Sequence, residues 1–127
     1  MDRFGAALEQ LYRQVGADLT NPFLVSALAS TDVALGLQEE GIEKARRAMA
    51  MRPVSEDAVD GTLIAIRFAV VCAWAKRLDL AFEQLYTTIR MPNDWLTYGD
   101  LKTNPTWDPV RKDSRFEEIL AELAPND

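Results

Sequence analysis

The spacing of apolar residues constrains the fold of this chain most strongly, because they recur every three or four positions along almost the whole sequence. That spacing places apolar side chains on one face of an α-helix. No stretch alternates apolar and polar residues over the length of a strand, and Asp60-Gly61 does not join two alternating runs as a hairpin turn does. The sequence therefore predicts an all-α fold, in a single domain of 127 residues that can bury a core of its own.

Proline, glycine and asparagine divide this pattern into helices. Asn21-Pro22 predicts a helix start with Asn as the N-cap, and Gly36 and Pro53 predict two helix ends. We predict a leading helix over 1–18, a helix pair over 21–53, a second pair over 61–92 and a C-terminal part over 96–123. Single helices are expected over 39–51, 62–75, 79–90 and 113–123, with a short helical turn over 98–102. The helix over 62–75 is apolar almost all round, so it should be the most buried.

The C-terminal part combines turn-forming residues with large aromatic ones. It contains Tyr98-Gly99-Asp100-Leu101-Lys102, then Asn104-Pro105-Thr106-Trp107-Asp108-Pro109-Val110-Arg111, then Asp113-Ser114-Arg115-Phe116. Two prolines flank Trp107, and Asp113 or Ser114 is a suitable N-cap for the last helix. We predict an ordered cap in which Trp107 covers the end of the core. Turn and capping hydrogen bonds made by Asp100, Asp108, Arg111 and Asp113 should hold this cap.

This segment resembles the closing signature of bacterial tetratricopeptide-repeat (TPR) proteins, Y-G-D-L followed by P-x-W-D-P-L-R-x-D-x-R-F, with Val110 in place of the usual Leu. The second half of the TPR consensus is similar to the set Gly36, Gly41, Ala45, Ala48 and Pro53. Such small residues permit a close helix crossing. A second set, Ala81, Leu85 and Thr88, matches the same consensus more weakly. Lys76 departs from the consensus because it stands where the turn glycine would be. The resemblance implies a TPR-like α-α superhelix of antiparallel helix pairs with a C-terminal capping helix.

The resemblance also implies a function, that of a non-catalytic protein–protein interaction module within a larger bacterial regulatory protein. TPR arrays bind partners on the concave surface formed by the first helix of each pair. Here that protein-binding groove would contain Phe23, Ser26, Ser30, Arg67, Val70 and Trp74. Arg67 is its one cation, so the chain does not fit the TPR type that captures a peptide carboxylate with several basic residues. The identity of the protein or peptide partner does not follow from the sequence.

Two of these residues leave alternatives open. Arg67 is the one charge in the most apolar helix, so we expect it to be buried and paired with Asp32 or another acid, with a ligand anchor as the alternative. Trp74 is expected to pack in the core or between helices, with an exposed binding platform as the alternative. A pocket near Arg67 and Trp74 would favour a small-ligand sensor instead.

The leading helix supports a third hypothesis, because it resembles the second helix of a repeat whose first helix is missing. Its apolar face would then be partly uncovered and available for an oligomerisation contact, such as a homodimer. The residues of this possible dimer face are Phe4, Leu8, Leu11 and Val15.

Composition excludes several other classes of function. The chain has no histidine and one cysteine, Cys72, inside an apolar run, so we expect no catalytic, cofactor or metal site and no enzyme activity. A net charge of −6 without a basic stripe argues against nucleic-acid binding. The run over 62–75 is shorter than the roughly 20 residues that a membrane span needs. With no signal peptide evident at the N-terminus, we expect a cytoplasmic protein with no membrane contact.

Overall fold

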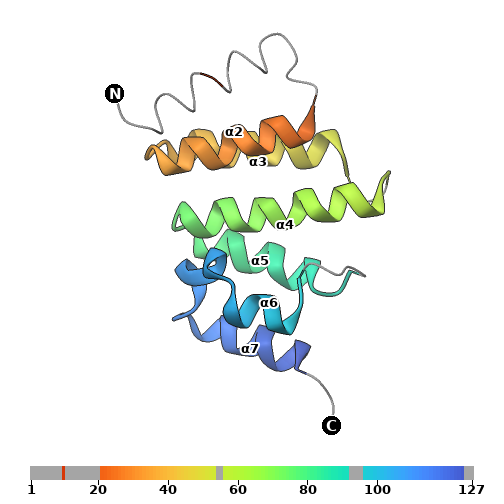
Figure 1. The fold of residues 1–127 in the computed structure, drawn as a ribbon, viewed down its shortest axis with the longest axis vertical. Helices are drawn as coiled ribbons and strands as arrows, with labels where there is room; N and C mark the ends of the chain where they lie inside the picture. The colour runs from red at the N-terminus through yellow and green to blue at the C-terminus, as the bar shows by residue number, and fades with distance from the viewer. Residues whose placement is uncertain (1–9, 11–20, 54–55, 92–95, 125–127) are drawn as a thin grey trace.

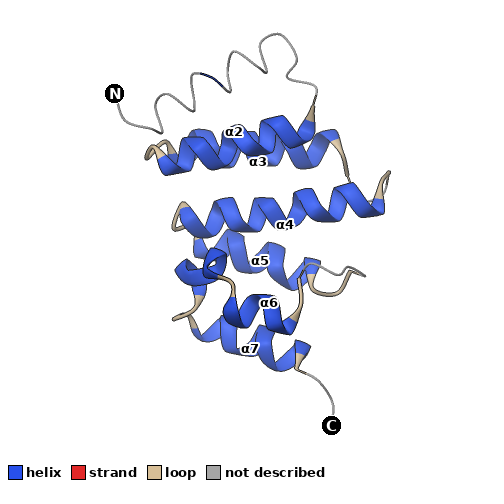
Figure 2. Cartoon of the chain, in the orientation of Figure 1, coloured by secondary structure: helices blue, strands red, loops and turns tan. Residues whose placement is uncertain are grey.

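A computed structural model describes residues 10, 21–53, 56–91 and 96–124. Within these residues every regular element is a helix, as Figure 2 shows, so the predicted all-α fold is confirmed. The elements are α2 (Pro22–Ala34), α3 (Gln38–Met51), α4 (Ala58–Trp74), α5 (Leu78–Thr88), α6 (Tyr98–Thr103), the 3₁₀ helix η1 (Pro105–Val110) and α7 (Ser114–Leu123). Apart from Gln10, the predicted leading helix lies outside the described residues, and with it the possible dimer face of Phe4, Leu8, Leu11 and Val15.

The described helices stack in sequence order along the long axis of the molecule (Figure 1). α2 and α3 form a pair joined by a short turn, and α4 and α5 form the next pair. α4 packs against both helices of the first pair, and η1 returns to contact α4 from the other side. α7 closes the stack against α6 and α5. α4 is therefore the central helix, and ten of its residues are buried, as predicted for the most apolar segment.

Side-chain caps fix where three of the helices begin. Asn21 accepts a hydrogen bond from the backbone N–H of Phe23 at 3.0 Å, as predicted for the start of α2. Asp113 caps α7 in the same way, accepting from the N–H of Arg115 at 2.9 Å. α4 begins at Ala58, four residues before the predicted start, because Asp57 caps it through the N–H of Asp60 at 2.9 Å.

The turns within the two pairs share one hydrogen-bonding pattern. In each, a residue with positive φ donates to the carbonyl three positions earlier, and the next residue donates to the carbonyl five positions earlier. The bonds are Gly36 to Val33 (3.0 Å), Leu37 to Asp32 (2.8 Å), Lys76 to Ala73 (3.1 Å) and Arg77 to Cys72 (2.9 Å). This pattern is the Schellman motif, in which the residue just past the helix end adopts left-handed backbone. Lys76, a departure in the sequence pattern, adopts φ 63° where Gly36 has φ 86°.

A close helix crossing follows the first turn, and a buried small residue stands at the matching position after the second turn. A Cβ atom on Gly41 would lie 2.6 Å from the Val33 side chain and 2.8 Å from the Ala29 carbonyl oxygen, so α3 approaches α2 as closely as glycine allows. Ala81 stands 40 positions later and is fully buried against α4. The other paired positions are also buried, namely Ala45, Ala48, Leu85 and Thr88. The two helix pairs therefore share the same turn motif and the same pattern of buried residues after it.

Candidate functional site

Two adjoining hollows lie along one face of α4, and we call them together the α4 groove. The larger, of about 720 Å³, lies between α2, α4 and η1, and its lining includes Ser30, Val33, Val70, Trp74, Thr106 and Asp108. The smaller, of about 430 Å³, lies between α4, α6 and η1, and its lining includes Ile66, Val70, Asp100, Asn104, Thr106 and Trp107. Val70 and Thr106 line both hollows, so the groove is continuous past η1. Ile66, Val70 and Trp74 supply its floor at intervals of four residues along α4.

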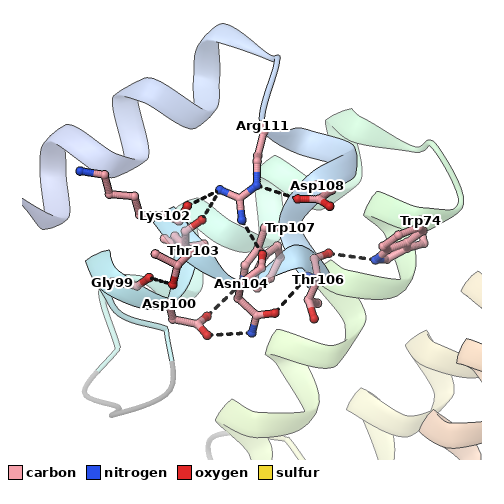
Figure 3. Close-up of polar contacts among 11 residues, drawn as sticks. Trp74, Gly99, Asp100, Lys102, Thr103, Asn104, Thr106, Trp107, Asp108 and Arg111 are labelled. Carbon is pink, nitrogen blue, oxygen red and sulfur yellow. Dashed lines mark hydrogen bonds and ion pairs between the residues drawn. The ribbon is translucent and has the colours of Figure 1, made fainter.

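Trp74 is the most prominent side chain of the groove. Its side chain is 49% exposed, and its Nε1–H donates to the backbone carbonyl of Thr106 at 2.9 Å, as Figure 3 shows. Trp74 was expected in the core or between helices, and its exposure excludes the core. The hydrogen bond anchors the indole to η1, so a large aromatic surface stands open to solvent in a fixed orientation.

Arg67 also departs from its predicted environment. Its side chain is exposed and not buried, and the guanidinium carbon lies 5.7 Å from the centroid of the Phe23 ring. Asp32, the expected partner of Arg67, is fully buried and pairs with Lys44 from α3 instead. The physical reason is that Arg67 falls on the same open arc of α4 as Val70 and Trp74. Arg67 lines neither of the two hollows.

Ser30 and Val70 join Trp74 at the groove, whereas Phe23 and Ser26 do not line it. Ser30, Val70 and Trp74 come together in the larger hollow. Phe23 is half-buried beneath Arg67 near the start of α2. Ser26 is only 2% exposed, so its side chain is not available to a partner and the prediction for it was wrong.

Sequence reasoning missed the wall of the groove that η1 provides. Thr106 and Asp108 were assigned to a terminal cap, yet they lie beside Trp74, more than 30 positions earlier in the chain. No short-range spacing pattern could reveal this contact, because it depends on the tertiary return of η1 to α4. The prolines around Trp107 indicated that the segment is ordered, but they did not indicate that it packs against α4.

The predicted burial of Trp107 and the predicted hydrogen bonds of the C-terminal part are confirmed within the described residues. The prediction that Trp107 covers the end of the core was wrong, because η1 packs against the central helix α4 and α7 closes the stack. Trp107 is 1% exposed, and its Nε1–H donates to Asp100 Oδ2 at 3.0 Å. Asn104 donates its side-chain amide to the other oxygen of Asp100 at 2.9 Å. Asp100 thus holds the start and the middle of the segment together, and η1 becomes a firm wall for the groove (Figure 3).

Arg111 completes the cap from the far side of η1. Its guanidinium donates to the backbone carbonyls of Leu101 at 2.8 Å, Lys102 at 2.7 Å and Asn104 at 2.5 Å. Its Nε–H donates to Asp108 Oδ1 at 2.8 Å. These carbonyls lie at the C-terminal end of α6, where an arginine satisfies acceptors that the helix leaves open.

The one cysteine of the chain, Cys72, lines neither hollow. Cys72 is fully buried, and burial raises the pKa of its thiol to about 11, so the thiol stays protonated and inaccessible. Among the described residues, no three potential ligands of the His, Cys, Asp and Glu types gather closely enough to hold a metal ion. The open aromatic and aliphatic surface is suited to contact with another molecule.

Comparison with protein-family models, with curated proteins and with solved structures found no match. In the part of the chain that the structure describes, no helix has both the length and the apolar character needed to cross a bilayer.

Proposed function

We propose that this chain is a non-catalytic protein–protein interaction module that binds a segment of a partner protein in the α4 groove. The observation that carries this proposal is Trp74, a half-exposed tryptophan that is hydrogen-bonded to Thr106 beside a hollow of about 720 Å³. Large aromatic side chains dominate the binding energy of protein interfaces, especially where they are held rigid before the partner arrives.

The proposal includes a TPR-like superhelix for the described helices. Support comes from the shared turn motif of Gly36 and Lys76 and from the buried small residues at matching positions after each turn. In an array of this type the groove would be the concave surface, with α2 and α4 as the first helices of their pairs. On the same resemblance, we place the module in a cytoplasmic bacterial regulatory protein.

A small-ligand sensor is the alternative, and one observation favours it. A volume of about 720 Å³ lies within the range of pockets that hold small molecules, roughly 300–1,000 Å³. However, Arg67, for which a ligand anchor was the alternative interpretation, lines neither hollow. A shallow apolar surface between three elements fits a polypeptide segment better.

Selection from a random peptide library displayed on phage, against the whole chain, tests the proposal. We expect peptides that bind the wild type and lose at least about 20-fold in affinity with Trp74→Ala, the effect of removing a hot-spot residue. Val59→Ala is the matched control, because Val59 is 63% exposed and lines neither hollow. Selected peptides that bind Trp74→Ala as tightly as the wild type would show that the groove is not the binding site.

A further inference from the structure

The α4 groove is lined by carboxylates and, among the described residues, by no cation. Asp108 lines the larger hollow and Asp100 lines the smaller one, and no lysine or arginine lines either. Asp100 is committed to the fold, because both of its oxygens accept hydrogen bonds from Trp107 and Asn104. Asp108 differs, since its side chain is 59% exposed. The solvent-exposed charge of the groove is therefore the negative charge of Asp108.

Asp108 is only partly neutralised by its neighbour. One of its oxygens accepts from Arg111 Nε–H at 2.8 Å, and the other has no hydrogen-bond partner among the described residues. The remaining nitrogens of Arg111 are directed to backbone carbonyls of the cap. A carboxylate with one oxygen held and one open keeps acceptor capacity for a second cation.

Trp74 adds a second feature that attracts cations. Its Nε1–H is bound to Thr106, its side chain is 49% exposed, and the face of an indole ring carries negative potential. Tryptophan is the aromatic residue that attracts ammonium and guanidinium groups most strongly. Trp74 and Asp108 line the same hollow, together with aliphatic Val33 and Val70.

We propose that the segment bound in the α4 groove carries a lysine or arginine side chain next to an aliphatic one. The cationic group lies against Trp74 and pairs with Asp108, and the aliphatic side chain packs on Val33 and Val70. This inference rests on the proposed function and specifies the chemistry of the partner. Arg67 does not oppose it, because it lies about 10 Å from Trp74 along the helix axis, and its guanidinium is stacked on Phe23.

The peptide selection described above supplies the probe. We expect the selected peptides to be enriched in Lys or Arg beside Leu, Ile or Val. Asp108→Asn lowers the affinity of such a peptide about 2- to 5-fold, the range for an exposed ion pair, and binding weakens as NaCl rises. Glu43→Gln, which removes an exposed acid of α3 outside both hollows, leaves the affinity unchanged.

A double-mutant cycle separates direct pairing from a structural effect of Asp108 on the cap. The peptide lysine is replaced by norleucine, which keeps the alkyl chain and removes the charge. The replacement weakens binding to the wild type more than it weakens binding to Asp108→Asn if the two charges pair, and the loss that remains with Asp108→Asn reports the contact of the cation with Trp74. Equal losses in both backgrounds overturn the proposed pairing.

The outcomes distinguish this inference from the proposed function. Peptides that depend on Trp74 but lack basic residues, or that tolerate Asp108→Asn, refute the cationic partner and leave the interaction module standing. Binding that ignores Trp74 refutes both. Light scattering on the wild type and on Trp74→Ala tests a second copy as the occupant, because a dimer dissolved by Trp74→Ala would assign the groove to self-association and overturn the inference.

Discussion

Replacing Lys76 with glycine should make this protein more stable. Lys76 has φ 63° in the turn between α4 and α5, a conformation that costs an L-residue about 1–2 kcal/mol because its Cβ approaches the backbone carbonyl. Its side chain is exposed and makes no hydrogen bond or ion pair among the described residues, so Lys76→Gly removes the strain without removing a contact.

The expected gain is the difference between two terms. Glycine relieves about 1–2 kcal/mol of left-handed strain but loses roughly 0.5–1 kcal/mol more conformational entropy on folding. The net stabilisation is therefore about 0.5–1 kcal/mol. For a chain of 127 residues, with an unfolding entropy of about 2.1 cal/mol/K per residue, that gain raises the Tm by about 2–4 °C.

Gly36→Ala is the matched reverse substitution. Gly36 holds the equivalent turn between α2 and α3 at φ 86°, and a Cβ atom there would meet nothing within 4 Å. The cost of Gly36→Ala is therefore purely conformational, and we expect a loss of about 1 kcal/mol. Urea unfolding followed by circular dichroism measures both variants, with an unchanged m-value showing that only stability has moved.

The two substitutions should have opposite signs, and this is what tests the reasoning. A destabilising Lys76→Gly would mean that the turn is not left-handed in solution. A neutral Gly36→Ala would remove the shared turn motif as support for a repeated helix pair.

Three further predictions concern the crossing, the cap and the acid limit of stability. Gly41→Ala should lower the free energy of unfolding, measured in urea, by at least about 2 kcal/mol, because its Cβ would meet a backbone oxygen at 2.8 Å. Ala81→Gly at the matching position should lower it by only about 1 kcal/mol. Arg111→Lys should cost about 2–3 kcal/mol by the same measurement, since an ammonium group cannot reach three carbonyls and Asp108 together. The hydrogen bonds from Arg115 lower the pKa of Asp113 from 3.8 to about 2. The ionised Asp113 carboxylate therefore stabilises the fold fully above pH 4, and this stabilisation is lost as the pH falls toward 2. Asp113→Asn, which retains a capping side chain, should give a shallower loss of Tm between about pH 4 and pH 2, and an identical acid profile would exclude this contribution.

Local chemistry allowed much of the fold to be predicted. Asn21-Pro22, Gly36 and Asp113 act through atoms within a few residues of themselves, so their roles in caps and turns follow from the sequence. The burial of Trp107 could also be predicted, because two prolines and several potential capping residues around a tryptophan are typical of ordered structure. These features depend on neighbours in the chain and require no knowledge of the tertiary arrangement.

The groove could not be predicted to the same extent. Arg67 and Trp74 belong to a helix that is apolar almost all round, and the sequence does not show which arc of such a helix is left uncovered. That arc is set by the return of η1 to α4, which covers part of it and leaves the rest open. The pair of Asp32 and Lys44 was missed because the sequence does not show whether Asp32 of α2 faces α3 or α4, and in the structure it pairs with Lys44 of α3.

The exposed Trp74 of α4 depends on the buried Trp107 of η1. Burying Trp107 and satisfying its Nε1–H through Asp100 fixes the backbone of η1 against the core. That backbone presents the carbonyl of Thr106 to Trp74, and the resulting hydrogen bond holds the exposed indole at the edge of the groove. A tryptophan left exposed without such a partner would sample several rotamers and would lose conformational entropy when a ligand ordered it. The cap is therefore part of the binding surface as well as of the core, and this dual role explains why the short segment over 98–110 contains such a dense set of hydrogen bonds.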